Sequence, residues 1–203
     1  MNKDKELLLG RIVDHLVLNS SFLTNTGLFH GMMGVILFLA HYARYKQSAY
    51  YEKLVEDLFS DLYEDICDDT PVNFENGLSG IGWGILYLLK NDFIDGSADI
   101  ILKNIDSKLL AVNVKYVNDF SLEHGLQGMY YYISMRVQYA NQIPFTYEYM
   151  SEWNIIKDKA ELHTDFDINS QLVDLANTKL ELIGSGLGLC DGCSGYGLML
   201  LRS

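Results

Sequence analysis

The stretch Asn76-Gly77-Leu78-Ser79-Gly80 holds two glycines three residues apart, with a polar residue in front and apolar residues behind. The same pattern recurs at three other places: His30-Gly31-Met32-Met33-Gly34, His124-Gly125-Leu126-Gln127-Gly128 and Asp191-Gly192-Cys193-Ser194-Gly195. The first glycines are separated by 46 residues (31 to 77), 48 residues (77 to 125) and 67 residues (125 to 192). Self-similarity at a period near fifty residues is typical of a repeat architecture.

Helical periodicity fills the intervals between these motifs. Apolar residues at helical spacing predict amphipathic helices over 4–18, 51–66, 98–111 (capped by Ser97) and 172–183. The segments directly after the glycines are apolar nearly all round, which predicts helices buried on most sides over 35–45, 81–89, 129–139 and 196–201. The chain is therefore expected to be all-α, with about four pairs of one amphipathic and one buried helix.

The longest interval carries an insertion, residues 142–169, with Pro144, several aromatic residues and one short helix expected around 151–162. A surface insertion and a lid or partner-docking segment both fit this composition, because long inserted loops are enriched for function.

Composition limits the class of protein. A chain of 203 residues with 49% hydrophobic residues suits one globular domain, 1–203. The formal charge of −12 argues against a nucleic-acid partner, since phosphate binding needs clustered Lys and Arg. The charged N-terminus lacks a secretory pattern, and the longest apolar run, 32–40, is too short for a membrane span. With only three cysteines, we expect a cytosolic protein without a membrane span.

The glycine pairs also predict where function is located. Small residues in the first helical turn let neighbouring backbones approach closely, so the helix starts are expected to converge at one end of a central cavity. The polar residues before the glycines (His30, Asn76, His124 and Asp191) would line that end, near Cys190 and Cys193. Helix capping is the alternative for Asn76 and Asp191. Histidine is a poor cap, so His30 and His124 stay open between function and structure.

These motifs resemble the inner-helix starts of the lanthionine synthetase C-like family, peptide cyclases built as an α/α toroid with Gly-x-x-Gly repeats. The resemblance is carried by Gly27-Leu28-Phe29-His30-Gly31, by 76–84 and by Gly188-Leu189-Cys190-Asp191-Gly192. It implies peptide modification: a cysteine thiol of the peptide adds to a dehydroamino acid and forms a thioether ring. In that family a zinc ion held by two cysteines and a histidine activates the thiol, and a histidine serves as acid and base.

Carried onto this chain, the resemblance names two sets of residues. His124, His30 and Asp191 are the expected catalytic residues, and Cys190, Asp191 and Cys193 the expected metal ligands. The family's Cys-His-Gly zinc motif corresponds to Cys190-Asp191-Gly192, where aspartate replaces the histidine, and its Trp-Cys-x-Gly motif is absent from the sequence. The zinc site is therefore expected to be degenerate.

Two alternatives remain from the same residues. A non-catalytic protein that binds a peptide or acts as a scaffold would keep the helices without the metal. A thiol-redox protein would use Cys190 and Cys193 as a Cys-x-x-Cys pair at a helix start. Four helix pairs are also fewer than the family's closed toroid contains, so an open apolar edge is expected to favour a homo-oligomer.

Overall fold

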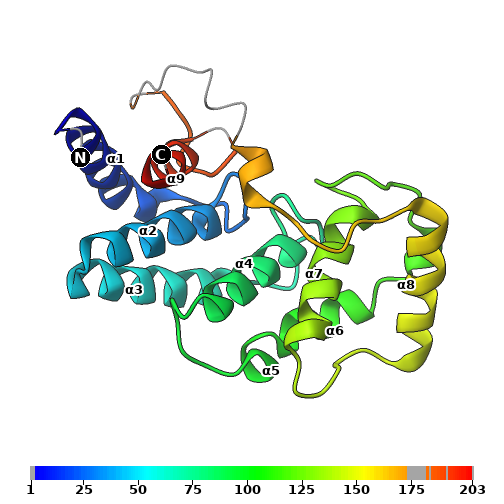
Figure 1. Cartoon of the computed structure of the whole chain (residues 1–203). Coiled ribbons are helices and arrows are strands. Elements are labelled where there is room, and N and C mark those ends of the chain that lie inside the picture. The colour runs from blue at the N-terminus through cyan, green and yellow to red at the C-terminus, as the bar shows by residue number, and fades with distance from the viewer. Residues whose placement is uncertain (1–2, 173–181, 183, 191, 203) are drawn as a thin grey trace. The chain divides into compact units, whose positions relative to one another are not determined.

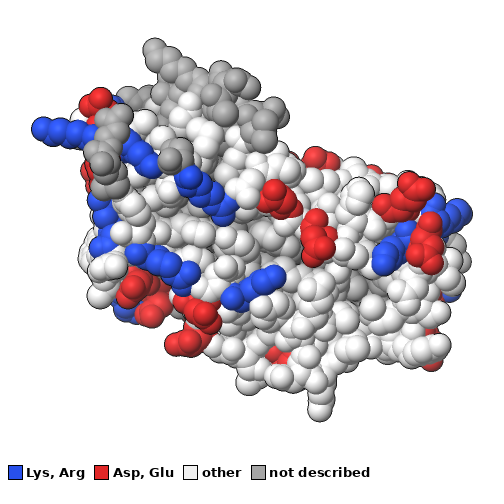
Figure 2. All heavy atoms as spheres, in the orientation of Figure 1, with Lys and Arg blue, Asp and Glu red and all other residues white. Residues whose placement is uncertain are grey.

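The computed structural model describes residues 3–172, 182, 184–190 and 192–202 of the chain. These residues form α-helices, short 3₁₀ turns and loops, with no strand among them, which confirms the all-α class (Figure 1). Among the described helices, none is both long and apolar enough to cross a membrane. On the face drawn in Figure 2, acidic and basic side chains are interspersed.

The chain divides into two compact units. Unit 1 consists of residues 1–68 and 167–203, and unit 2 consists of residues 69–166. The first and last glycine motifs therefore belong to unit 1, while the second and third belong to unit 2.

Unit 1 is built around one buried helix, α2 (Met32–Lys46), which packs against α3 (Ala49–Asp65) and α9 (Cys193–Arg202). Helix α1 (Lys3–Asn19) also packs on α9, and the short turns η1 (Ser20–Phe22) and η3 (Ile168–Gln171) complete the unit. The apolar run 32–40 is buried throughout, and each large side chain removed from water there stabilises the fold by about 1.5–3 kcal/mol. Gly197 lies against the ring of Phe38, which occupies the space of a side chain at that position.

Unit 2 repeats this scheme with α4 (Leu78–Lys90) as its apolar helix. Helix α4 packs against α7 (Leu126–Tyr139) and α6 (Lys103–Leu110), and Gly82 leaves room for the ring of Tyr132. The remaining elements are α5 (Ala98–Ile101), η2 (Val114–Tyr116) and α8 (Tyr147–Ala160), the last of which packs on η2.

Where the structure describes the chain, the expected helices agree with the observed ones, with two differences of detail. The helix expected over 98–111 is interrupted at Leu102, which separates α5 from α6. Ser97 stands at the N-cap of α5, yet its side chain makes no capping hydrogen bond. The helix expected over 172–183 lies almost entirely outside the described residues.

Candidate functional site

All four glycine motifs close the same backbone loop in front of a helix. The N–H of the residue after the first glycine donates to the carbonyl seven residues earlier. These bonds are Met32 to Asn25 (2.8 Å), Leu78 to Pro71 (2.8 Å), Leu126 to Asp119 (2.9 Å) and Cys193 to Gly186 (2.9 Å). A backbone carbonyl thus satisfies an N–H that a helix start otherwise leaves without a partner.

The loop also explains the first glycine of each motif. A Cβ atom at this glycine would approach the same loop carbonyl closer than 3.0 Å in all four motifs. The described N-cap residues of α2, α4 and α7 are these glycines, Gly31, Gly77 and Gly125, in extended backbone conformation. His30, Asn76 and His124 therefore lie one residue outside the helix, next to the capping position rather than in it.

Within each unit the two loops bond to each other in the same way. In unit 2 the carbonyl of Glu123 accepts from the N–H groups of Phe74 (3.0 Å) and Glu75 (3.1 Å). In unit 1 the carbonyl of Phe29 accepts from Leu189 (2.7 Å) and Cys190 (3.1 Å). We call the loops before Gly31 and Gly125 the acceptor loops, and the loops before Gly77 and Gly192 the donor loops.

The second glycine of the motif after each acceptor loop leaves room for the paired donor loop. A Cβ at Gly128 would meet the carbonyl of Leu122 and the side chain of Phe74 in the donor loop, both closer than 3.0 Å. A Cβ at Gly34 would lie 2.6 Å from the carbonyl of Leu28 and 3.0 Å from Leu189. The glycines were expected to let neighbouring backbones approach closely, and Gly34 does so against Leu189, whereas Gly128 leaves room for the side chain of Phe74.

Donor loops share a further bond of their own. The hydroxyl of Ser194 donates to the carbonyl of Leu187 (2.6 Å), and the hydroxyl of Ser79 donates to the carbonyl of Val72. Both serines are buried and lie two residues after the first glycine. Each unit therefore contains one donor loop and one acceptor loop. In unit 1 the donor loop precedes Gly192 and pairs with the acceptor loop before Gly31, so the last motif pairs with the first.

In unit 2 the loop pair brings two of the polar side chains together. Nε2 of His124, in the acceptor loop, lies 3.4 Å from Oε2 of Glu75, in the donor loop. The His124 side chain is 60% exposed and that of Glu75 is 18% exposed, so the imidazole faces water while the carboxylate is largely covered. Asn76 follows Glu75 in the same donor loop, where its N–H donates to Oδ1 of Asn73 (3.1 Å).

The corresponding positions in unit 1 are His30 and Cys190. His30, like His124, directly precedes the first glycine of an acceptor loop, and Cys190, like Glu75, stands two residues before the first glycine of a donor loop. Gly188 packs against the backbone of His30, where a Cβ would lie 2.5 Å from its Cα. Both side chains are half-buried. The structure therefore places an imidazole and a thiol on two loops that are bonded to each other.

The expected metal ligands do not share one environment. Cys193 is fully buried in the first turn of α9, and burial raises the pKa of its thiol, which disfavours the thiolate that binds a metal. Cys190 is half-buried in the donor loop, and Asp191 lies outside the described residues. No group of three His, Cys, Asp or Glu suited to a metal ion occurs among the residues that the structure describes. Those residues alone therefore do not supply a zinc donor set.

The candidate residues are divided between the units. Unit 1 contains His30, Cys190 and Cys193, whereas unit 2 contains Asn76 and His124. Two cavities found in the described parts of the units, one of about 340 Å³ beside His15 and one of about 290 Å³ beside Arg136, are lined by other residues.

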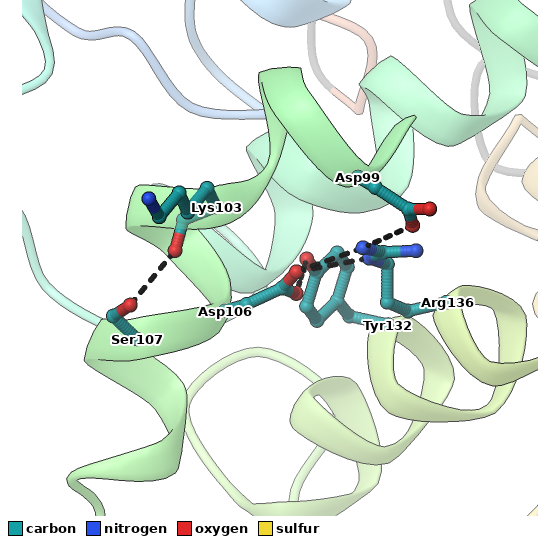
Figure 3. A network of polar contacts seen from close by, with 6 residues as sticks. All are labelled: Asp99, Lys103, Asp106, Ser107, Tyr132 and Arg136. Carbon is teal, nitrogen blue, oxygen red and sulfur yellow. Dashed lines mark hydrogen bonds and ion pairs between the residues drawn. The ribbon is translucent and has the colours of Figure 1, made fainter. Parts of the chain in front are cut away.

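The second cavity borders a buried polar network that the sequence analysis missed (Figure 3). Arg136, only 1% exposed, donates from Nε to Oδ2 of Asp106 (3.0 Å) and from Nη2 to Oδ1 of Asp99 (2.9 Å). The hydroxyl of Tyr132 donates to Oδ1 of Asp106. Burial raises the pKa of the Asp106 carboxyl, against the opposing effect of the Tyr132 hydroxyl and the Arg136 charge. The signal available in the sequence was a charged residue on an otherwise apolar helix face, at 106 and again at 136.

In comparisons with known proteins, no family model, no curated protein and no solved structure matched this chain.

Proposed function

We propose that this chain acts on peptides, as a divergent relative of the lanthionine synthetase C-like proteins with a toroid-like arrangement of its helices. The supporting observation is the loop pair of unit 1, in which Cys190 N–H donates to the carbonyl of the residue before His30. An imidazole and a thiol on adjoining, half-exposed loops are groups that can exchange a proton with a bound thiol compound.

The proposed reaction is thioether ring formation in a dehydrated peptide. The peptide's cysteine thiol gives its proton to the imidazole of His30, and its sulfur forms a bond to the β-carbon of a dehydroalanine or dehydrobutyrine. The C=C bond becomes a single bond, and the imidazole returns the proton to the α-carbon. Nothing leaves and nothing is oxidised, so the step needs no further reactant. Zinc, if bound, would increase the acidity of the thiol.

The direct test incubates the purified chain with a peptide that contains one cysteine and one dehydroalanine. Addition leaves the mass unchanged, so ring formation is followed as the loss of alkylatable thiol by mass spectrometry. We expect a rate above that of the peptide alone, reduced about 100-fold or more in His30→Gln, because general acid–base catalysis contributes about 10²–10⁴.

His15→Gln is the matched control, because His15 lies in α1 of the same unit and contacts Asn19. It should retain the wild-type rate. A wild-type rate equal to that of the peptide alone would refute the catalytic proposal.

A non-catalytic peptide-binding protein is the second candidate. It is favoured by the burial of Cys193, since a buried thiol is poorly placed to bind a metal. This candidate predicts peptide binding without any acceleration of ring formation, and the same assay with a binding measurement separates the two.

A further inference from the structure

Residues 163–166 of unit 2 lie against the starts of α4 and α7 as a bound peptide would. We call this segment the strap. The side-chain amide of Gln127 donates from Nε2 to the carbonyl of His163 (3.0 Å), and the N–H of His163 donates to Oε1 of Gln127 (3.0 Å). One side chain thus bonds to both main-chain groups of one residue, a contact that any residue except proline can make whatever its side chain.

Three residues further on, Phe166 anchors the strap in an aromatic cluster. Its ring centroid lies 5.0 Å from that of Phe74, 5.0 Å from that of Trp83 and 5.4 Å from that of Tyr131. The first two contacts are edge-to-face, with interplanar angles of 78° and 85°. Edge-to-face contact is a favoured geometry of aromatic pairs, because the positive ring edge meets the negative ring face.

The rest of the strap contributes little that is specific. The side chains of His163 and Asp165 are exposed, and Thr164 is half-buried, with its hydroxyl bonded to the neighbouring carboxylate of Asp165 (3.0 Å). The strap is therefore held by a main-chain pair and one aromatic side chain. A peptide that bends as the strap does at Thr164, with an aromatic residue three positions after the residue bonded to Gln127, offers the same groups.

The surface under the strap also belongs to a glycine motif. Gln127 occupies the position of the motif where both donor loops carry a buried serine, and it follows His124 by three residues. Where Ser79 and Ser194 bond inward to their own loops, Gln127 reaches a separate segment of chain.

We propose that Gln127 and the aromatic cluster of Phe74, Trp83 and Tyr131 form a peptide-binding site, which the strap occupies in this structure and a peptide with an aromatic anchor can enter. This inference rests on the peptide ligand of the proposed function and does not require catalysis. A tethered segment competes at an effective concentration in the millimolar range, so binding to the wild type should be weak.

The test uses the Phe166→Ala chain, in which the anchor is removed and the site is vacated. The probe is a fluorescent peptide of the sequence Leu-His-Thr-Asp-Phe-Asp with blocked ends, followed by fluorescence anisotropy. We expect it to bind Phe166→Ala at least ten-fold more tightly than the wild type. Adding Gln127→Ala should abolish this gain, and a probe with alanine in place of phenylalanine should not bind. Equal affinity for wild type and Phe166→Ala, or equal binding of both probes, would overturn the proposal.

Should Phe166→Ala not fold, the wild type itself provides the measurement. Several millimolar unlabelled peptide should displace the strap and accelerate hydrogen exchange at the His163 amide, whereas the alanine peptide should leave it unchanged. Exchange that is unaffected by either peptide would contradict the inference. Because the probe has no dehydroamino acid, its binding is independent of ring formation, so failure of one proposal is distinguishable from failure of the other.

Discussion

Gly128 provides the sharpest test of how the paired loops are held together. In Gly128→Ala the new methyl group would meet the Leu122 carbonyl and the Phe74 side chain closer than 3.0 Å. The Leu122 carbonyl belongs to the acceptor loop itself, and the Cβ of Phe74 is fixed to the donor-loop backbone, so the two loops must shift apart. Two interloop hydrogen bonds at about 1 kcal/mol each would weaken, and overpacking adds about 1–3 kcal/mol. Alanine is more favourable than glycine inside a helix by about 1 kcal/mol, which offsets part of this loss.

The expected net result is a loss of about 2–4 kcal/mol in the free energy of unfolding, from the magnitudes for hydrogen bonds and overpacking. Urea titration followed by tryptophan fluorescence measures it, because both tryptophans, Trp83 and Trp153, lie in unit 2. Gly10→Ala in α1 is the control: nothing lies within 4 Å of its added methyl group, so it should stabilise by about 0.5–1 kcal/mol in a titration followed by circular dichroism. A Gly128→Ala variant at least as stable as the wild type would refute the loop-packing argument.

Three further substitutions test separate parts of the structure. Burial, with the charges of Arg202 and Arg44, lowers the pKa of His41 to about 4 from 6.5, so its folded form binds protons more weakly than its unfolded form. Stability should therefore fall by up to about 3 kcal/mol between pH 6.5 and 4, and the difference between wild type and His41→Gln in pH-dependent urea titrations isolates this contribution from the carboxylates. Arg136→Met leaves the Asp106 carboxylate buried without its cation and should lower the free energy of unfolding by about 3–5 kcal/mol. The double variant Arg136→Met with Asp106→Leu should recover most of this loss in thermal unfolding. No recovery would contradict the assignment of a buried ion pair. Thr146→Ala removes the side-chain cap of α8, which accepts from Tyr149 N–H, and should cost about 1 kcal/mol by urea titration, whereas Thr146→Ser should be near neutral.

The helix starts were predictable because their packing requires glycine at fixed positions, and glycine can be recognised in the sequence. The first glycine of each motif leaves room for a loop carbonyl. At Gly34 and Gly128 the second glycine leaves room for a neighbouring loop, so both positions of the pair require a residue without a side chain. The apolar segments that follow were predictable for the same reason, since helices buried on most sides have few polar positions.

The pairing of the loops was not predictable. It is made by backbone groups, as in the bonds from Leu189 and Cys190 to the carbonyl of Phe29, and any residue except proline can provide an N–H. The partner of His124 was hidden for a related reason. Glu75 is one of 27 acidic residues in the chain, and only the loop pairing distinguishes it from the others.

The insertion that contains the strap was predictable only in part. The insertion was expected to contain a short helix, and helix α8 lies there. The contacts of Phe166, by contrast, depend on residues from three separate segments of unit 2, and no local pattern in the sequence joins them.

The placement of His30 and Cys190 on two loops that are bonded to each other is the central claim, and the reactivity of the Cys190 thiol tests it most directly. In a Cys67→Ser chain, which removes the exposed cysteine, the alkylation rate is measured against pH; buried Cys193 should react far more slowly. Because the two residues lie on loops that are bonded to each other, we expect His30→Gln to slow the alkylation of Cys190 at neutral pH, whereas His15→Gln should leave the profile in place. An alkylation profile that is the same with and without His30 would contradict the account.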